Sequence, residues 1–211
     1  MADFKIEKKI LNPDIKRIAG VDEVGRGALF GPVVAAAVVL PCGWISKPVR
    51  GWLRQVDDSK RIAPDKRKKL ARLILAEAEA FAVGLATSRE IDEKNIYWAS
   101  LEAMKRAVAG LAPPPDFLLL DGYKSREGGF SCPQLGIPGG DHKSLSVAAA
   151  SIVAKVVRDE MIVRLEGFYT GYHLANNKGY GTKDHYRALR EKGPTSLHRL
   201  TFDLEGKGPR A

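Results

Sequence analysis

Two short apolar runs stand out in the first forty residues. They cover residues 15–23 and 33–40, and a glycine-rich turn lies between them. Apolar runs of this length that end in turn residues are typical of buried β-strands. The pattern therefore predicts two strands joined by a short connection.

Helical and strand patterns then alternate along the chain. The predicted elements are a helix over residues 64–80, a strand over 81–88, a helix over 89–110 and a buried strand over 116–122. Turn-rich connections are expected over residues 41–51 and 122–141. This order indicates an α/β fold in which helices cover a central sheet.

The last third of the chain combines a long helix with a polar extension. Residues 144–165 predict the helix, because their Ala and Ser faces allow close packing against a sheet. The remainder predicts a loop, a short helix near 183–192 and an extended basic tail. We expect one domain over residues 1–211, with a core over about 17–170 and a small helical extension over about 171–211 that faces the ligand.

Composition narrows the class of protein. The chain has 211 residues and is 45% hydrophobic, which suffices for one sizeable core. A formal net charge of +9 favours a polyanionic partner, nucleic acid first, although heparin-like binding or simple solvation gives a similar total. No signal peptide and no apolar run of about 18 residues is present, so we expect a cytoplasmic monomer without membrane contact. Cys42 and Cys132 are too few for a disulfide framework or a zinc site.

Acidic residues follow the predicted strands. Asp22 and Glu23 end the first strand, Asp121 ends the strand over 116–122, and Asp141 precedes the long helix. Ligands of open α/β sheets gather beyond the carboxyl ends of the strands, so adjacent parallel strands would bring these acids to one edge. Hard divalent cations such as Mg²⁺ take such oxygen ligands, and the pattern predicts a metal site.

Two observations weigh against a simple metal site. A single Asp at a strand end is more often a turn former or a helix cap. Consecutive strand residues also point to opposite faces, so Asp22 and Glu23 serve one site only if the strand ends or bends there. Gly25 permits such a bend.

The motifs together resemble ribonuclease HII, the type 2 ribonucleases H. The matching segments occur in the family's order over about residues 17–202: GVDEVGRGALFGPVVAAAVVL, DDSKRIAPDKR, LLLDG, GGDHKSLSVAAASIVAKVVRD, NKGYGTKDH and GPTSLHR. The chain departs from the family pattern at Ala28, Phe30, Gly139 and Asn177, where proline, a small residue, lysine and histidine are usual. His142 and Lys143 are candidates for the positive charge that Gly139 lacks.

The resemblance implies an RNase H-like fold and a metal-dependent endonuclease. The expected activity is hydrolysis of the RNA strand of RNA–DNA hybrids, including cleavage 5′ to a single ribonucleotide embedded in duplex DNA, with 3′-hydroxyl and 5′-phosphate products. Such an enzyme acts in ribonucleotide excision and RNA primer removal during DNA replication and repair. The implied cofactors are two Mg²⁺ or Mn²⁺ ions. Their implied ligands, and the catalytic residues, are Asp22, Glu23, Asp121 and Asp141.

Substrate contacts follow from the same resemblance. Gly25 and Gly27 would bring the backbone close to a ribose 2′-hydroxyl, and Arg26 would contact phosphate, against the alternative of a tight turn with a solvated arginine. The other implied contacts are Ser59 and Lys60 in the Asp-Ser-Lys segment, Ser151 and Lys155 on the long helix, and Tyr180 at the RNA–DNA junction. For Ser59 the alternative is a turn former, for Ser151 and Lys155 a helix surface, and for Tyr180 a core anchor.

Rival functions fit less well. The P-loop and dinucleotide-binding glycine patterns are absent. A non-catalytic hybrid-binding protein of the same fold would share the charge, but it would have no need of four acids that repel phosphate. Ribonuclease HIII is disfavoured, because it carries a different residue between the glycines and an extra N-terminal domain. The four histidines are expected to be surface or backbone-contacting groups, and a sliding-clamp or polymerase contact is left open.

Overall fold

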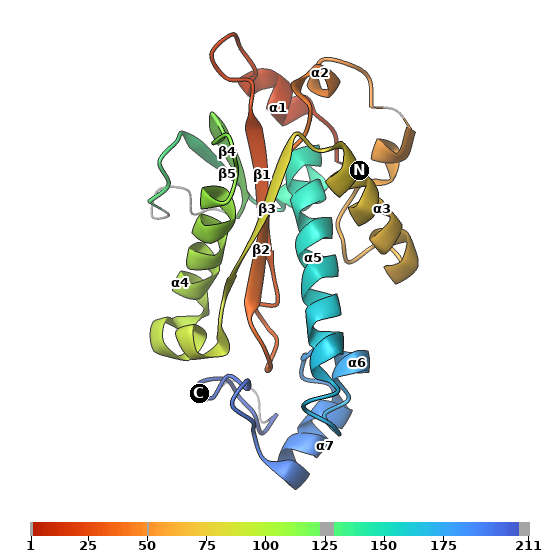
Figure 1. Ribbon diagram of the computed structural model, residues 1–211, viewed down its shortest axis with the longest axis vertical. Coiled ribbons are helices and arrows are strands. Elements are labelled where there is room, and N and C mark those ends of the chain that lie inside the picture. Colours follow the sequence, from red (N-terminus) through yellow and green to blue (C-terminus); the bar gives the residue numbers. More distant parts are fainter. Residues whose placement is uncertain (1, 50, 123–128, 207–211) are drawn as a thin grey trace.

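A mixed five-stranded sheet with the order β3-β2-β1-β4-β5 forms the centre of the molecule. Figure 1 shows the computed structural model, which describes residues 2–49, 51–122 and 129–206. The strands are β1 Ile18–Val24, β2 Val33–Val39, β3 Ala80–Ala86, β4 Phe117–Asp121 and β5 Gln134–Ile137. The predicted α/β class and four predicted strands are confirmed.

The pairing of β1 decides where the acidic residues meet. β1 runs antiparallel to β2 but parallel to β4, and Val21 lies opposite Leu120. The carboxyl ends of β1 and β4 therefore reach the same edge of the sheet. Asp22 follows Val21 and Asp121 follows Leu120, so the register brings these two acids side by side.

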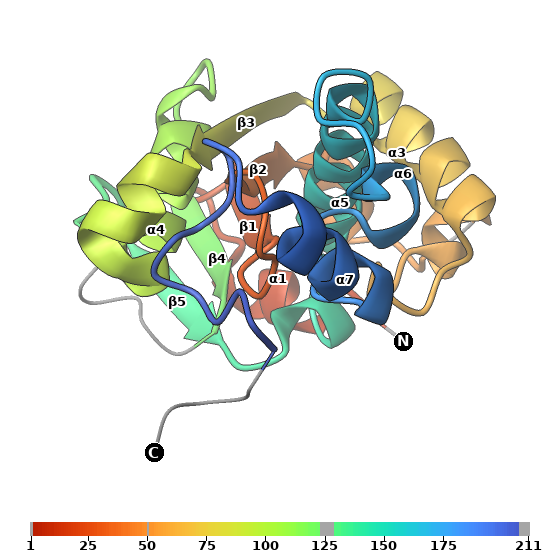
Figure 2. The same cartoon turned by 90° about the horizontal axis from the view of Figure 1, so that it is seen from below.

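Helices cover both faces of the sheet (Figures 1 and 2). α4 packs on one face and α5 on the other, where α3 lies beside it. The helical elements are α1 Lys5–Ile10, α2 Cys42–Ile45, η1 Gly51–Gln55, α3 Pro64–Glu77, α4 Ser88–Ala109, η2 Gly140–His142, α5 Leu145–Leu165, α6 Leu174–Asn177 and α7 Lys183–Lys192. Among the described residues, no helix is long and apolar enough to cross a lipid bilayer.

The structure corrects three sequence-based expectations. The connection expected over 122–141 contains the edge strand β5, and the connection over 41–51 contains α2. Residues 123–128 of the first connection lie outside the described residues. The helix predicted over 89–110 is interrupted at Asn95, which has a φ of 67°. The Asn95 side chain accepts hydrogen bonds from the backbone of Tyr97 and Trp98, so it caps a new helical segment.

The C-terminal extension packs against the loop that follows β1. Phe30 is fully buried in a cluster with Ile162, Tyr172, Leu174 and Leu189. Apolar contacts therefore connect α6 and α7 to the end of α5 and to residues 29–30, which lie just beyond the acidic edge of the sheet.

Two buried histidines join segments of this extension. His185 and His198 are 0% and 1% exposed, and their Nε2 atoms are 3.1 Å apart. His142 and His173 are exposed, as expected for surface groups, whereas the burial of His185 and His198 was not expected. Both buried rings also contact backbone, at Tyr180 O and Thr195 N. Burial lowers the pKa of both histidines, to about 4 for His198.

This buried pair predicts acid sensitivity. The unfolded chain takes up a proton on His198 near its ordinary pKa of 6.5, whereas the folded chain resists protonation down to about 4. Protonation therefore favours the unfolded state as the pH falls through this window, by up to about 3 kcal/mol. Urea unfolding of the wild type and of His198→Asn between neutral pH and pH 4 measures this effect. The variant should be less stable at neutral pH but lose less stability on acidification, and equal losses would contradict the prediction.

Candidate active site

A cavity of about 340 Å³ lies at the carboxyl end of β1. The structure brings ten of the twelve predicted site residues to its wall: Asp22, Glu23, Gly25, Arg26, Gly27, Ser59, Lys60, Asp121, Ser151 and Tyr180. Asp141 and Lys155 are not among the lining residues. The strand β1, the loop after it, the 57–60 loop, α5 and the C-terminal extension all contribute to this wall.

Asp22 points to the α5 side of the sheet. It is 6% exposed, and Ser151 of α5 hydrogen-bonds to its carboxylate. The Ser151 and Ser59 hydroxyls hydrogen-bond to each other at 3.0 Å, which ties the 57–60 loop to the site. Burial, followed by the charges of Glu23 and Asp121, raises the pKa of Asp22 well above its ordinary value. A buried acid among other acids is stabilised by a bound cation.

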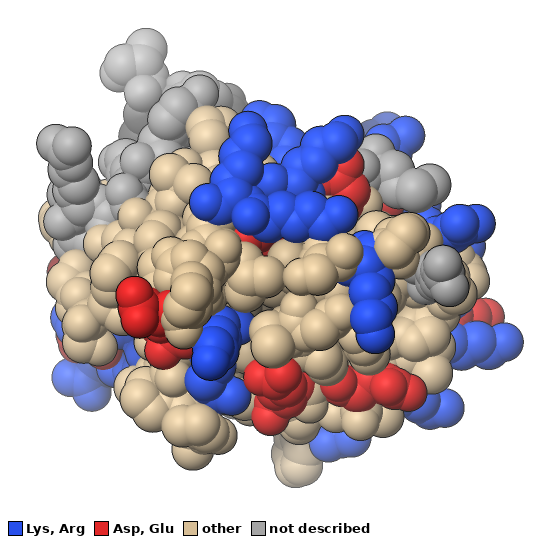
Figure 3. Space-filling model, turned by 90° about the horizontal axis from the view of Figure 1, so that it is seen from above, with Lys and Arg blue, Asp and Glu red and all other residues tan. Residues whose placement is uncertain are grey.

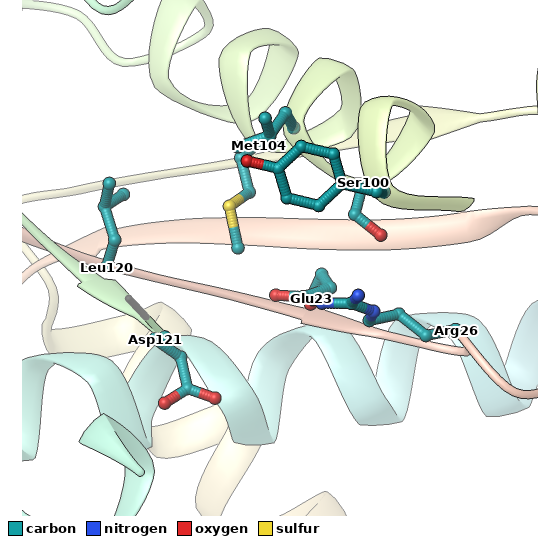
Figure 4. Close-up of a pocket in the computed structure, with 9 residues that line it drawn as sticks. Glu23, Arg26, Ser100, Met104, Leu120 and Asp121 are labelled. Atoms are coloured by element: carbon teal, nitrogen blue, oxygen red, sulfur yellow. Dashed lines mark hydrogen bonds and ion pairs between the residues drawn. The ribbon is translucent and has the colours of Figure 1, made fainter. Parts of the chain in front are cut away.

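Glu23 points to the α4 side, as strand alternation requires. Figure 4 shows its side chain beside Arg26 and below Ser100, whereas Asp121 points in the opposite direction, towards α5. The Glu23 carboxylate accepts a hydrogen bond from Arg26 Nη1 at 3.0 Å. Burial raises the pKa of Glu23, and the Arg26 charge opposes this effect. Glu23 and Asp121 also line a second cavity, of about 250 Å³, against Met104 of α4.

Asp121 and Asp141 are connected through the backbone. Asp121 Oδ1 accepts a hydrogen bond from the N–H of Gly140 at 2.6 Å, which holds η2 against the end of β4. Asp141 follows in η2 and is 6% exposed. Burial and the charge of Asp121 raise the pKa of Asp141. Asp141 therefore lies within the electrostatic reach of the acids in the cavity, although it does not line the cavity.

A second group of polar side chains adjoins Asp141. His142 Nε2 lies 3.5 Å from Asp58 Oδ2 and 3.9 Å from Asp141 Oδ1, and its Nδ1 lies 3.7 Å from Asp57 Oδ1. One potential ligand atom from each of Asp58, Asp141 and His142 lies within 4.8 Å of the others, which is close enough to hold a metal ion. Asp58 was not among the predicted ligands. His142 supplies the nearby positive charge when protonated, whereas Lys143 turns away to the Pro138 carbonyl.

Two buried arginines donate hydrogen bonds to residues 25–32, the loop after β1 that we call the glycine loop. Arg158 donates to the carbonyl oxygens of Phe30, Pro32 and Lys178, and Arg199 donates to those of Gly31 and Arg26. Carbonyl and N–H groups of a trans peptide point in opposite directions, so the Gly27 N–H faces away from Arg199. The sequence motifs contained both arginines, but nothing in them indicated this structural role. Arg158 is one of several charged residues in α5, and Arg199 lies outside the helices, so no sequence signal distinguished them.

Tyr180 and Lys155 lie together beside the loop. The Tyr180 ring is half-buried, with Lys155 Nζ 5.3 Å and Arg158 Cζ 5.4 Å from its centre. Lys155 forms an ion pair with Asp159 at 2.8 Å. Lys155 thus contacts its own helix and Tyr180, and its contact with substrate stays a prediction.

Comparison with known proteins decides the family. The ribonuclease HII family model matches residues 19–205. The chain belongs to the ribonuclease HII family. It is 51% identical over 187 residues to the ribonuclease HII of Acaryochloris marina, an alignment that covers 89% of this chain and 92% of the relative.

Solved structures show the same fold. The crystal structure of ribonuclease H2 from Pyrococcus horikoshii has a TM-score of 0.73 and 26% identity, covering 90% of this chain and 95% of that one. Bst-RNase HIII, solved in complex with Mn²⁺, has a TM-score of 0.65 at 23% identity, with 92% of this chain and 69% of that one covered. The latter comparison concerns the fold alone, and the family match is to ribonuclease HII rather than ribonuclease HIII.

The chemistry of the site fits the divalent metal ions that ribonuclease HII enzymes use. Asp22, Glu23 and Asp121 supply carboxylate oxygens at one edge, and burial together with mutual repulsion raises the pKa of Asp22 and Glu23. Hard cations prefer such ligands and would relieve the repulsion. When bound, Mg²⁺ or Mn²⁺ supplies stabilisation of negative charge on phosphate oxygens and lowers the pKa of coordinated water.

The half-buried ring of Tyr180 is expected to stack on a nucleotide of the substrate. Tyr180→Ala should reduce cleavage of a duplex with one ribonucleotide by about tenfold or more, because stacking on a nucleotide contributes about 1–3 kcal/mol. Tyr180→Phe should retain most activity, since it keeps the ring. Cleavage kinetics and thermal unfolding measure these effects, with Tyr186→Ala as a control in the same extension. Early unfolding of Tyr180→Ala, or normal cleavage by it, would contradict the prediction.

Proposed function

We propose that this protein is an endonuclease that hydrolyses the RNA strand of RNA–DNA hybrids and cuts duplex DNA 5′ to a single embedded ribonucleotide. The observation that carries the proposal is one cavity in which Asp22, Glu23 and Asp121 share a wall with the glycine loop and Tyr180. Acids alone would suit many metal-dependent phosphodiesterases. A backbone loop that can approach a sugar closely is what adds a preference for ribose.

We assign metal binding, ribose contact and phosphate contact to separate groups of residues. Asp22, Glu23 and Asp121 would hold the metal ions, with Asp141 as a further ligand beside them. Gly25 and Gly27 would let the backbone meet the 2′-hydroxyl, and the Gly27 N–H, which faces away from Arg199, would donate to it. The phosphate and sugar contacts are proposed for Arg26, Ser59, Lys60, Ser151, Lys155 and Tyr180.

Arg26 would have two partners. Its guanidinium is half exposed and contacts the Glu23 carboxylate, so a substrate phosphate would compete with Glu23 for it. Hydrogen bonds between guanidinium and phosphate are bidentate and strong. Release of Glu23 from Arg26 would then leave both Glu23 oxygens available as metal ligands.

The chemistry of the product ends and the cellular process follow from the same reaction. Attack of water on the phosphate 5′ to the ribonucleotide leaves a 3′-hydroxyl on one fragment and a 5′-phosphate on the other. Such ends suit ribonucleotide excision and RNA primer removal in DNA replication and repair. We further propose that the protein acts as a monomer in the cytoplasm.

One cleavage assay tests the function. The protein is incubated with an end-labelled DNA duplex that carries a single ribonucleotide, with Mg²⁺, with Mn²⁺ or with a chelator, and an all-DNA duplex of the same sequence is the control. Cleavage 5′ to the ribonucleotide that requires a metal ion supports the proposal. If the protein binds the duplex but leaves it uncut with either metal ion, it is a hybrid-binding protein, and the proposed function is overturned.

A further inference from the structure

A row of lysines covers the outer face of α1. Lys5, Lys8 and Lys9 have the i, i+3 and i+4 spacing that places side chains on one face of a helix, and all three are exposed. Figure 3 views the molecule from the end that carries α1, and a large group of Lys and Arg side chains covers this region. Lys5 pairs with Asp3 at 2.9 Å. Lys8 and Lys9 have no ion-pair partner within residues 2–49, 51–122 and 129–206.

A buried carboxylate holds α1 in place. Glu7, on the inner face, is 0% exposed and accepts hydrogen bonds from Ser144 Oγ at 2.6 Å and from Ser146 N at 3.0 Å. These groups belong to the first turn of α5, where the helix dipole favours a negative charge. The lysines therefore have a defined position relative to α5.

This position is close to the candidate active site. The N–H of Leu145 donates to the carbonyl of Asp3 at 3.0 Å, and Asp141 lies in the η2 turn just before α5. Ser151, which contacts Asp22, follows Leu145 by about 9 Å along the helix at 1.5 Å per residue. A duplex advances about 3.4 Å per base pair, so this distance of about 9 Å corresponds to about three base pairs. Figure 1 shows α1 beyond the start of α5, so the lysines would meet phosphates more than about three base pairs from the cleavage site.

We propose that Lys8 and Lys9 of α1 form a second contact surface for the phosphate backbone of the duplex that flanks the cleavage site. The inference rests on the proposed function. Unpaired lysines on a fixed element neutralise phosphates and release counterions without reading the base sequence. The protein would thus bind long duplexes with higher affinity than short ones.

A pair of substrates separates this contact from catalysis. Both carry one ribonucleotide, with about 12 base pairs on each side in the long duplex and about three in the short one, assayed at low temperature so that the short duplex stays paired. In the double variant Lys8→Gln/Lys9→Gln, the KM for the long duplex should rise about three- to tenfold. The slope of log(kcat/KM) against log[salt] should become less steep by about one to two. The KM for the short duplex and both kcat values should stay within about twofold.

A charge-matched variant controls for the net charge. Lys66→Gln with Lys69→Gln removes two exposed lysines from α3. The proposal is overturned if this variant raises the long-duplex KM equally, if the α1 variant impairs both duplexes alike, or if the α1 variant changes neither. Thermal unfolding shows whether α1 stays in place. Failure of the wild type to cleave either duplex would instead contradict the proposed function.

Discussion

Replacement of Asp121 by asparagine is expected to lower the turnover of a ribonucleotide-containing duplex by about a thousandfold or more, while the fold survives. The amide keeps the shape of the carboxylate, and its oxygen can still accept the 2.6 Å hydrogen bond from Gly140 N. The charge that would bind a metal ion is lost. Repulsion of Asp22 also falls, so thermal stability should stay equal or rise. Steady-state cleavage and thermal unfolding measure the two effects.

Asp116→Asn is the matched control for this variant. Asp116 precedes the same strand, and its carboxylate accepts hydrogen bonds from the backbone of Lys16 and Arg17, away from the cavity. The control removes one negative charge from the same part of the chain and should leave turnover nearly unchanged. Near-normal turnover by Asp121→Asn at moderate Mg²⁺ would refute the assignment of Asp121 as a metal ligand.

Gly25→Ala is expected to destabilise the protein and to abolish most activity. Gly25 has a φ of +94°, and an added Cβ would lie 2.0 Å from Nε of the buried Arg158 side chain. Arg158 cannot swing aside without losing its hydrogen bonds to Phe30, Pro32 and Lys178. The combined backbone strain and overpacking should cost about 3 kcal/mol. Urea unfolding and cleavage of the single-ribonucleotide duplex measure both consequences.

Gly27→Ala separates the function of the loop from its stability. Among the described residues other than its chain neighbours, no heavy atom lies within 4 Å of a Cβ at Gly27, so the free energy of unfolding should change by less than about 0.5 kcal/mol. If the Gly27 backbone approaches the ribose, the added methyl group should still reduce cleavage about tenfold, because small displacements of a bound substrate are costly. Equal stability and equal cleavage in Gly27→Ala would exclude close approach at this position.

The sequence predicted the central elements because their signals are local. The apolar runs of β1, β2 and β4 are short and end in turn residues, and the order of strands and helices indicated the α/β class. The acids at the strand ends were recognised from the same pattern. Their convergence required an assumption, namely that β1 and β4 are parallel neighbours, and the structure shows this pairing.

Features that depend on distant contacts could not be predicted in the same way. β5 has four residues and, in the part of the chain that the structure describes, pairs with β4 alone, so its sequence carries little strand signal of its own. The interruption at Asn95 depends on a side-chain cap inside a segment of helical pattern. Arg199 and His198 are surface-type residues by composition, and their burial follows from packing between the extension and the loop after β1.

The parallel pairing of β1 with β4 has a consequence during synthesis on the ribosome. The first acids and the glycine loop leave the ribosome early, but Asp121 is separated from Asp22 by two strands and two long helices in the chain. Contacts between residues so far apart in sequence form late, because closure of a long loop costs conformational entropy. A nascent chain that ends before β4 lacks both the strand beside β1 and the acid at its end. It would therefore bind metal ions weakly and leave the nucleic acids around the ribosome uncut until the sheet is complete.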